Sequence, residues 1–184
     1  GLFNTHRPTS AHLRSRKEVG DIIRSSSIPS ITFRASIIIG SGSISFELIR
    51  NLTERLPIMI TPKWVRVKAQ PISVTDVLSY LKESIHLKNT KHEVYEIGGL
   101  DQISYSDIML EYAKQRNLKR IIIPVPVLSP YLSGLWLSIL TPLYSNIGRK
   151  LIDGIKVPTV VTNQSKTLRD FSIQPMSMKA AIAK

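Results

Sequence analysis

The chain has 184 residues, of which 42% are hydrophobic and 21% are charged, so it can bury the core of a folded domain. Twenty-five Lys and Arg residues against 13 Asp and Glu residues give a formal net charge of +12. The absence of Cys excludes a disulfide scaffold, a Cys-ligated metal site and a thiolate nucleophile. The four His residues show no metal-binding spacing.

Helical and strand patterns alternate along the chain, which is typical of an α/β fold. After a loop over 1–9, we expect a helix from Ser10 to about Arg24, a strand over 31–39 and a helix from Ser43 or Ser45 to about Leu56. A strand over 58–60, an alternating segment over 64–69, a helix over 75–85 and a strand over 93–97 follow. The last predicted elements are a helix from Ser104 to about Arg116, with Asp107 completing a capping box, and an extended segment over 120–127.

The first helix carries apolar residues at helical spacing. Leu13, Val19, Ile22 and Ile23 are expected to form its buried face, and Gly20 would let it pack closely on its neighbour. His12 and Arg16 are four positions apart and therefore share one face of this helix. A titratable imidazole beside a permanent cation could supply an acid and hold a ligand phosphate or ribose, and a solvated basic helix face is the alternative.

The basic residues are concentrated in 1–70 and 121–184, whereas 71–120 is neutral. Basic ends can meet a phosphate-bearing ligand, nucleic acid or an anionic membrane, or simply form a basic surface. Aromatic residues make up only 7% of the chain, so we expect no nucleic-acid partner.

Residues 121–148 contain no charged side chain. A run of this length could span a bilayer, but four Pro residues divide it and its longest Pro-free piece is 131–141. We therefore expect a buried helix or the apolar wall of a pocket. A peripheral membrane contact is the alternative, because Arg149 and Lys150 flank the run.

Five blocks in the same order resemble the later half of the atypical, extended short-chain dehydrogenases/reductases, which include NAD(P)-binding, epimerase-like members. The blocks are Ser10–Gly20, Phe33–Gly40, Gln70–Val77 with its Asp at position 76, Val94–Gly99 and Ser104–Met109. The resemblance implies the later part of a Rossmann-type parallel sheet with flanking helices and a small C-terminal substrate region. It also requires Ile31–Ile39 and Val94–Ile97 to lie in one sheet.

The active helix of this family carries Tyr-x-x-x-Lys, and this chain has His12-x-x-x-Arg16 at the matching positions. The resemblance implies that His12 would be the acid/base and that Arg16 would hold the cofactor ribose. His titrates near neutral pH, whereas Arg keeps its proton. Ordinary carbonyl reduction is thus in question.

The resemblance also implies that NAD or NADP is the cofactor, with Ala35, Ser36, Ile37 and Ile38 beside its nicotinamide ring. Phe46 and Trp64, together with the uncharged run, are candidate walls for the substrate. Ala69, with Lys68 adjacent, stands where nucleotide-sugar members carry a basic residue, so a nucleotide sugar is not indicated.

The Gly-rich pyrophosphate loop of the family has no counterpart in these residues, and Gly40-Ser-Gly42 is too short to replace it. We therefore expect the N-terminal half of the domain to be missing and the fragment alone to bind cofactor weakly or not at all. The expected division is 1–40 as the end of the NAD(P)-binding domain, 41–91 as substrate-region elements, 92–100 as the last core strand and 101–184 as the C-terminal substrate-binding region.

We therefore interpret the chain as a fragment of an NAD(P)-binding oxidoreductase or epimerase-like protein that acts on an unknown small molecule. A lipophilic substrate is compatible with this interpretation. A non-catalytic NAD(P)-binding sensor or scaffold and a peripheral membrane-associated protein are the alternatives. No leader-like segment is visible, so we expect a cytoplasmic protein, with membrane association as the alternative.

Overall fold

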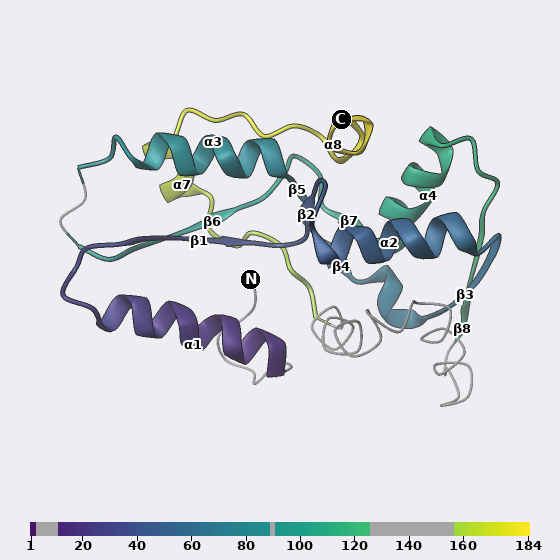
Figure 1. Cartoon of the computed structure of the whole chain (residues 1–184), viewed down its shortest axis with the longest axis horizontal. Coiled ribbons are helices and arrows are strands. Elements are labelled where there is room, and N and C mark those ends of the chain that lie inside the picture. The colour runs from purple at the N-terminus through teal and green to yellow at the C-terminus, as the bar shows by residue number, and fades with distance from the viewer. Residues whose placement is uncertain (3–10, 89–90, 126–156) are drawn as a thin grey trace.

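The computed structural model describes residues 1–2, 11–88, 91–125 and 157–184 (Figure 1). The expected cap Ser10 and residues 126–148 of the uncharged run lie outside these ranges. Within them, helices alternate with short strands, and three of the four strand pairs are parallel. The predicted α/β class with parallel strands is confirmed.

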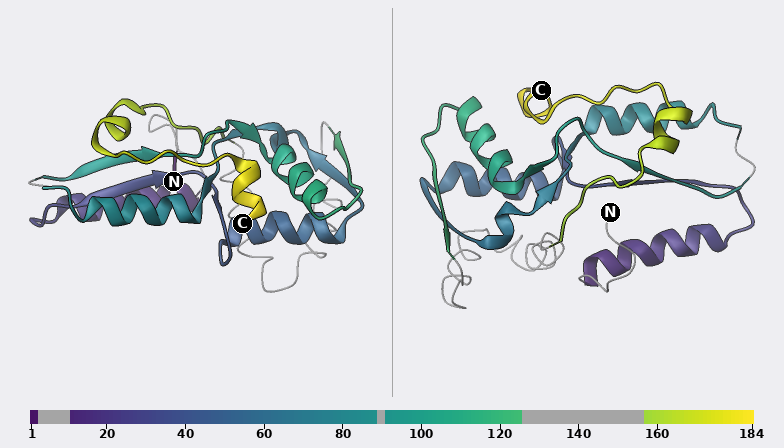
Figure 2. Two further views of the ribbon diagram at one scale, coloured as in Figure 1. Left: turned by 90° about the horizontal axis from the view of Figure 1, so that it is seen from above. Right: turned by 180° about the vertical axis from the view of Figure 1, so that it is seen from behind.

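The longest described parallel ladders organise the two ends of the molecule. Strand β1 (Ile31–Ala35) pairs with β6 (Glu93–Ile97), so the first part of the segment over 31–39 lies directly beside the segment over 94–97, as the resemblance implies. Figures 1 and 2 show α1 (Ala11–Ser25) on one side of this ladder and α3 (Val74–Ser84) on the other.

An aromatic cluster joins α3 and the segment after α7 (Ser165–Asp170) to the β1–β6 ladder. Phe33, Tyr80, Tyr95 and Phe171 have ring centroids 5.0 to 5.9 Å apart. The Tyr95 hydroxyl donates to Asp170 at 2.9 Å, which ties the end of α7 to β6. Helix α3, although it falls in the expected 41–91 region, therefore packs with the sheet of the first region.

A second hydrophobic core lies at the other end of the molecule, among α2 (Ile44–Arg55), α4 (Tyr105–Gln115) and α8 (Met178–Ala183). Around it lie the parallel pair β3 (Ile58–Pro62) and β8 (Ile121–Val125), the antiparallel pair β4 (Lys68–Ala69) and β7 (Ile103–Ser104), and the 3₁₀ turn η1 (Lys63–Arg66). The predicted capping box is confirmed, because Ser104 and Asp107 bond each other's backbone amides at the start of α4.

The segment predicted as one strand over 31–39 is divided in two. Strand β1 ends at Ala35, and the chain then changes partner, so that β2 (Ile38–Ile39) pairs with β5 (Ile72–Ser73). The β-branched run predicts extended backbone but does not specify its neighbour. The division falls at Ser36, next to the site described below.

Two further expectations are wrong. Residues 64–69 do not form an alternating strand: η1 ends at Arg66, and only Lys68 and Ala69 pair as a strand, because so short an alternation does not outweigh local coiling. Helix α1 buries Leu13 and Gly20, but its other predicted core residues stay exposed: Val19 by 47%, Ile22 by 63% and Ile23 by 40%. None of the described residues covers that part of the helix.

Candidate functional site

The candidate site lies at the carboxyl ends of β1 and β6, where open parallel sheets bind ligands. The Ala35 carbonyl at the end of β1 accepts a hydrogen bond from the Leu2 amide at 3.1 Å. The next residue, Ser36, shares a 2.7 Å hydrogen bond with the hydroxyl of Thr159. Ala35 and Ser36, two of the four residues predicted to face the nicotinamide ring, are therefore held by hydrogen bonds to Leu2 and Thr159.

The other two predicted residues continue the turn into β2. Ile37 is buried, and its carbonyl accepts from the Ile72 amide at 3.0 Å. Ile38 is half-buried and lies opposite Ile72 in the β2–β5 ladder. The turn is therefore held on both sides by neighbouring strands, which fixes the backbone that would face a ligand.

Thr159 connects three segments at this point. Its amide donates to the Lys68 carbonyl at 3.0 Å, and its carbonyl accepts from the Gln70 amide at 3.1 Å. Its hydroxyl shares a hydrogen bond with the hydroxyl of Ser36. Burial raises the pKa of Tyr105, and the hydrogen bond to Thr159 opposes that shift.

Gln70 fastens the strand ends next to Thr159. The side chain is only 2% exposed; its amide donates to the Gly99 carbonyl at 2.8 Å, and its oxygen accepts from the Val161 amide at 3.0 Å. Gly98 must lack a side chain here, because a Cβ would lie 2.7 Å from the Gln70 side chain. Gln70 therefore locks the end of β6 to the 159–161 segment.

Asp76, the fixed Asp of the Gln70–Val77 block, is buried in the first turn of α3. Its carboxylate accepts from the Met176 amide at 3.0 Å. In this structure it anchors the C-terminal segment to α3.

Positive charge gathers between the start of α1 and the end of β1. The backbone of His12 lies in the first turn of α1, and its side chain is outside what the structure describes. Arg16 is exposed one turn later. Residue 1 lies between the two elements: a Cβ at Gly1 would lie 3.2 Å from the Leu13 side chain in α1 and 4.0 Å from the Ala35 carbonyl oxygen at the end of β1.

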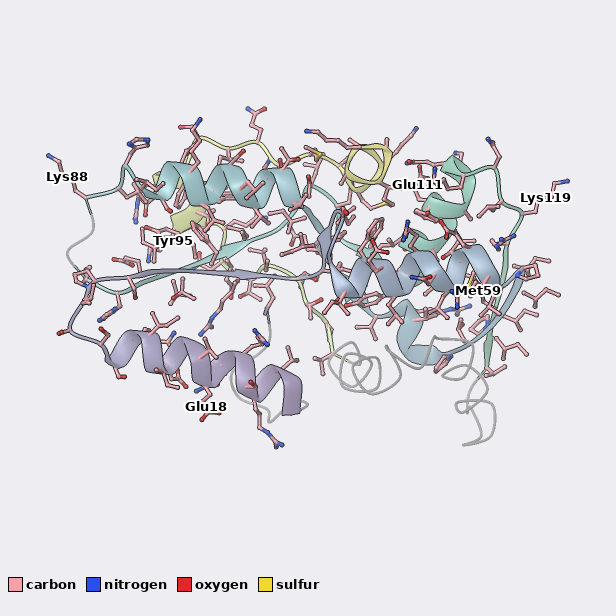
Figure 3. The ribbon with its side chains drawn as sticks, in the orientation of Figure 1. Glu18, Met59, Lys88, Tyr95, Glu111 and Lys119 are labelled. Carbon is pink, nitrogen blue, oxygen red and sulfur yellow. The ribbon has the colours of Figure 1, made fainter. Side chains whose placement is uncertain are left out.

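Guanidinium groups can bind hydroxyl or phosphate oxygens, and the Leu2–Ala35 hydrogen bond and the closeness of Gly1 to Leu13 bring the start of α1 to the end of β1. The outward side of α1 is separate from this site, as the position of Glu18 in Figure 3 shows. The described residues contain no group of three or more side chains that could hold a metal ion.

The two predicted substrate walls are placed differently. Phe46 is only 8% exposed and packs edge-on against Tyr112, with ring centroids 6.0 Å apart, inside the second core. The backbone of Trp64 lies in η1, and its side chain is outside the described residues. Phe46 belongs to the same hydrophobic cluster as Ile37, which follows Ser36 in the turn. The substrate role of Phe46 and Trp64 stays a prediction.

Sequence reasoning missed four residues of this site: Arg34, Gln70 as an anchor, Tyr105 and Thr159. Arg34, Gln70 and Tyr105 lay within blocks that carry the resemblance, so their positions could have been singled out. Thr159 has no motif around it, since its role depends on a segment that returns to the sheet 123 positions after Ser36.

No protein family profile matches the chain, and no curated protein sequence matches it. No helix among the described residues combines the length and the apolar composition needed to cross a bilayer.

Solved structures of similar fold do exist. dTDP-4-dehydrorhamnose reductase from Bacillus anthracis, solved with NADP, matches 99% of this chain with a TM-score of 0.65 at 15% identity. dTDP-glucose 4,6-dehydratase from the same organism, solved with NAD, matches 99% with a TM-score of 0.62 at 16% identity. The Bordetella bronchiseptica enzyme WbmH, solved with NAD⁺, matches 97% with a TM-score of 0.60 at 15% identity.

The chain spans about half the length of these structures: 56%, 55% and 52% of their chains. At such low identity the likeness establishes the fold. The resemblance to extended short-chain dehydrogenases/reductases is therefore confirmed at the level of fold.

Proposed function

We propose that the chain is the nicotinamide- and substrate-facing part of an NAD(P)-binding protein of the oxidoreductase or epimerase-like class. The observation that carries the proposal is the parallel β1–β6 ladder, whose carboxyl end holds Ser36 and Thr159 near the start of α1, the helix that carries Arg16. The solved structures of the same fold, which hold NAD or NADP, support the choice of cofactor.

When bound, NAD(P) supplies the hydride acceptor or donor. The residues Ala35 to Ile38 provide a fixed backbone edge for the ring, and Arg16 provides hydrogen-bond donors for ribose or phosphate oxygens. As the resemblance implies, His12 would give or accept the substrate proton, because an imidazole can exchange a proton near neutral pH. The small-molecule substrate would lie towards the C-terminal region.

We further propose that a preceding segment of the same protein completes this sheet. Val19, Ile22 and Ile23 on α1 are exposed, and all five residues of β1 are half-buried. The Leu2 amide already bonds the end of β1 at Ala35. Added strands and a helix would bury these apolar groups and would supply the pyrophosphate-binding loop.

Calorimetric titration with NADH and NADPH tests the proposal on the 184-residue chain and on the full-length product that contains it. We expect weak or no binding by the chain alone and saturable binding by the full-length product. Arg16→Gln should weaken that binding about tenfold, because it removes a charge-assisted hydrogen bond. Lys114→Gln on α4 makes the same charge change away from the site and should leave affinity unchanged. Absence of binding by the full-length product would exclude the proposal.

A non-catalytic sensor or scaffold is the second candidate, and the replacement of Tyr-x-x-x-Lys by His12-x-x-x-Arg16 favours it. A sensor would bind the cofactor through Arg16 without turnover. A screen of the full-length product with NADPH and a panel of aldehydes and quinones separates the two candidates: turnover supports an enzyme, and binding without turnover supports a sensor.

A further inference from the structure

The ladder formed by β3 and β8 has two different faces. Its register places Ile58 opposite Ile121 and Ile60 opposite Ile123, and because side chains alternate along a strand, all four share one face. We call these four residues the isoleucine face. Ile58 is 56% exposed, Ile121 60% and Ile123 45%.

The opposite face belongs to the core. Met59 and Thr61 are fully buried, and Ile122 packs against the second hydrophobic cluster. Figure 3 shows Met59 at this end of the molecule, with α2 beside it. Because the opposite face of the β3–β8 pair is already packed in the core, the isoleucine face is directed outward by the fold.

Basic residues stand where both strands begin. Because β3 and β8 run parallel, Arg55 and the pair Lys119–Arg120, which precede them, lie at the same edge, and the Ile121 amide bonds the Pro57 carbonyl at 3.0 Å. Lys119 is exposed and points away from the body in Figure 3.

Arg120 is held in place, because its guanidinium donates to the Glu54 carbonyl at 2.9 Å. The nearby Glu54 carboxylate is engaged by the Tyr112 hydroxyl at 2.5 Å. The edge thus presents the exposed Lys119 beside an exposed β-branched surface.

Exposed large apolar side chains beside cations match the boundary between lipid acyl chains and anionic headgroups. We propose that the isoleucine face docks on the surface of an anionic lipid bilayer, with its isoleucines entering the headgroup region and Lys119 contacting lipid phosphates. This surface lies at the opposite end of the molecule from α1 in Figure 1, so it is independent of the proposed nucleotide site.

The test is co-sedimentation of the 184-residue chain with vesicles of phosphatidylcholine alone or of phosphatidylcholine mixed with phosphatidylserine. We expect binding to the mixed vesicles and little binding to the neutral ones. The double variant Ile58→Gln, Ile121→Gln should weaken binding at least about tenfold, because two apolar side chains no longer enter the interface. Lys119→Gln should weaken it about fivefold, since one cation near an anionic surface is removed.

The matched control is Ile85→Gln, which alters an isoleucine that is 78% exposed at the end of α3. It should leave vesicle binding unchanged, and the thermal unfolding of all variants should resemble that of the parent, because the altered side chains face solvent. Equal binding to both vesicle types, or equal loss in the Ile85 variant and the double variant, would overturn the proposal. So would a concentration-dependent dimer that the double variant abolishes without any vesicle binding.

Discussion

Ser36 and Thr159 lie 123 positions apart in the chain and share a hydroxyl–hydroxyl hydrogen bond of 2.7 Å. This bond joins the end of β1 to the segment that runs beside β4. It is placed where the structure changes from one parallel ladder to the next, so it holds the turn that would face a nicotinamide ring.

Replacing Thr159 by Val keeps the side-chain volume and removes this bond. We expect the free energy of unfolding to fall by about 1–2 kcal/mol, because the hydrogen bonds of a buried hydroxyl are lost while the half-buried Ser36 can bond to water. Urea unfolding followed by far-ultraviolet circular dichroism measures the change.

Ser36→Ala supplies the matched comparison. If the two hydroxyls act mainly on each other, the double variant should be hardly less stable than Thr159→Val alone. Fully additive effects would show that the contact between Ser36 and Thr159 carries little coupling energy.

Gln70→Leu tests the anchor at the end of β6. The substitution leaves the Gly99 carbonyl and the Val161 amide without a buried partner, so we expect a loss of about 2–5 kcal/mol in the free energy of unfolding. Gln102→Leu is the control, since Gln102 is exposed and bonds Gln70 only at 3.4 Å. A Gln70 variant as stable as the Gln102 variant contradicts the role of Gln70.

The sequence pattern predicted most of the regular elements because their signals are local. Ser104 and Asp107 form the capping box that their spacing indicates, and the helix over 75–85 is observed as α3. The strand break at Ser36 could not be predicted, since it depends on which strand lies alongside. The exposed side of α1 at Ile22 could not be predicted either, because periodicity marks an apolar face and not what covers it.

The site was predictable only where a family motif contains the residue. The resemblance pointed to the turn at Ser36, and the structure describes that turn as held by neighbouring strands. Thr159 acts through contacts between distant segments, which no local pattern encodes. The chemistry of His12 stays a prediction.

His12→Gln tests the acid/base assignment in the full-length product. Gln keeps hydrogen-bonding capacity but does not titrate, so we expect turnover to fall about a hundredfold or more with little change in cofactor affinity. Steady-state kinetics and calorimetry on the same preparations measure the two quantities. Unchanged turnover would remove His12 from the mechanism.

Tyr95 makes the free energy of unfolding depend on pH in the alkaline range. Burial, followed by its hydrogen bond to Asp170, raises the pKa of Tyr95 from 10.0 to about 12. Because the pKa of Tyr95 is higher in the folded state, folding favours the protonated hydroxyl. The contribution of Tyr95 to the free energy of unfolding is therefore complete below pH 10 and is lost as the pH rises through 12. We expect a loss on the order of 2 kcal/mol across this window.

Urea unfolding at pH 8 to 12, compared between the parent and Tyr95→Phe, measures this contribution. The Phe variant should lose less stability across the same range, because the ring stays in the aromatic cluster without a hydroxyl to ionise. Parallel curves for the two proteins would assign the alkaline sensitivity to the other tyrosines.

The two five-residue parallel ladders join strands that are distant in the chain: β6 follows β1 only after α2 and α3, and β8 follows β3 only after α3 and α4. Closing such long loops is entropically costly before any pairing rewards it, so such chains fold on the order of milliseconds to seconds. During synthesis, β1 therefore leaves the ribosome well before its partner β6. The nascent chain must keep an unmatched, β-branched segment out of wrong associations until that partner arrives.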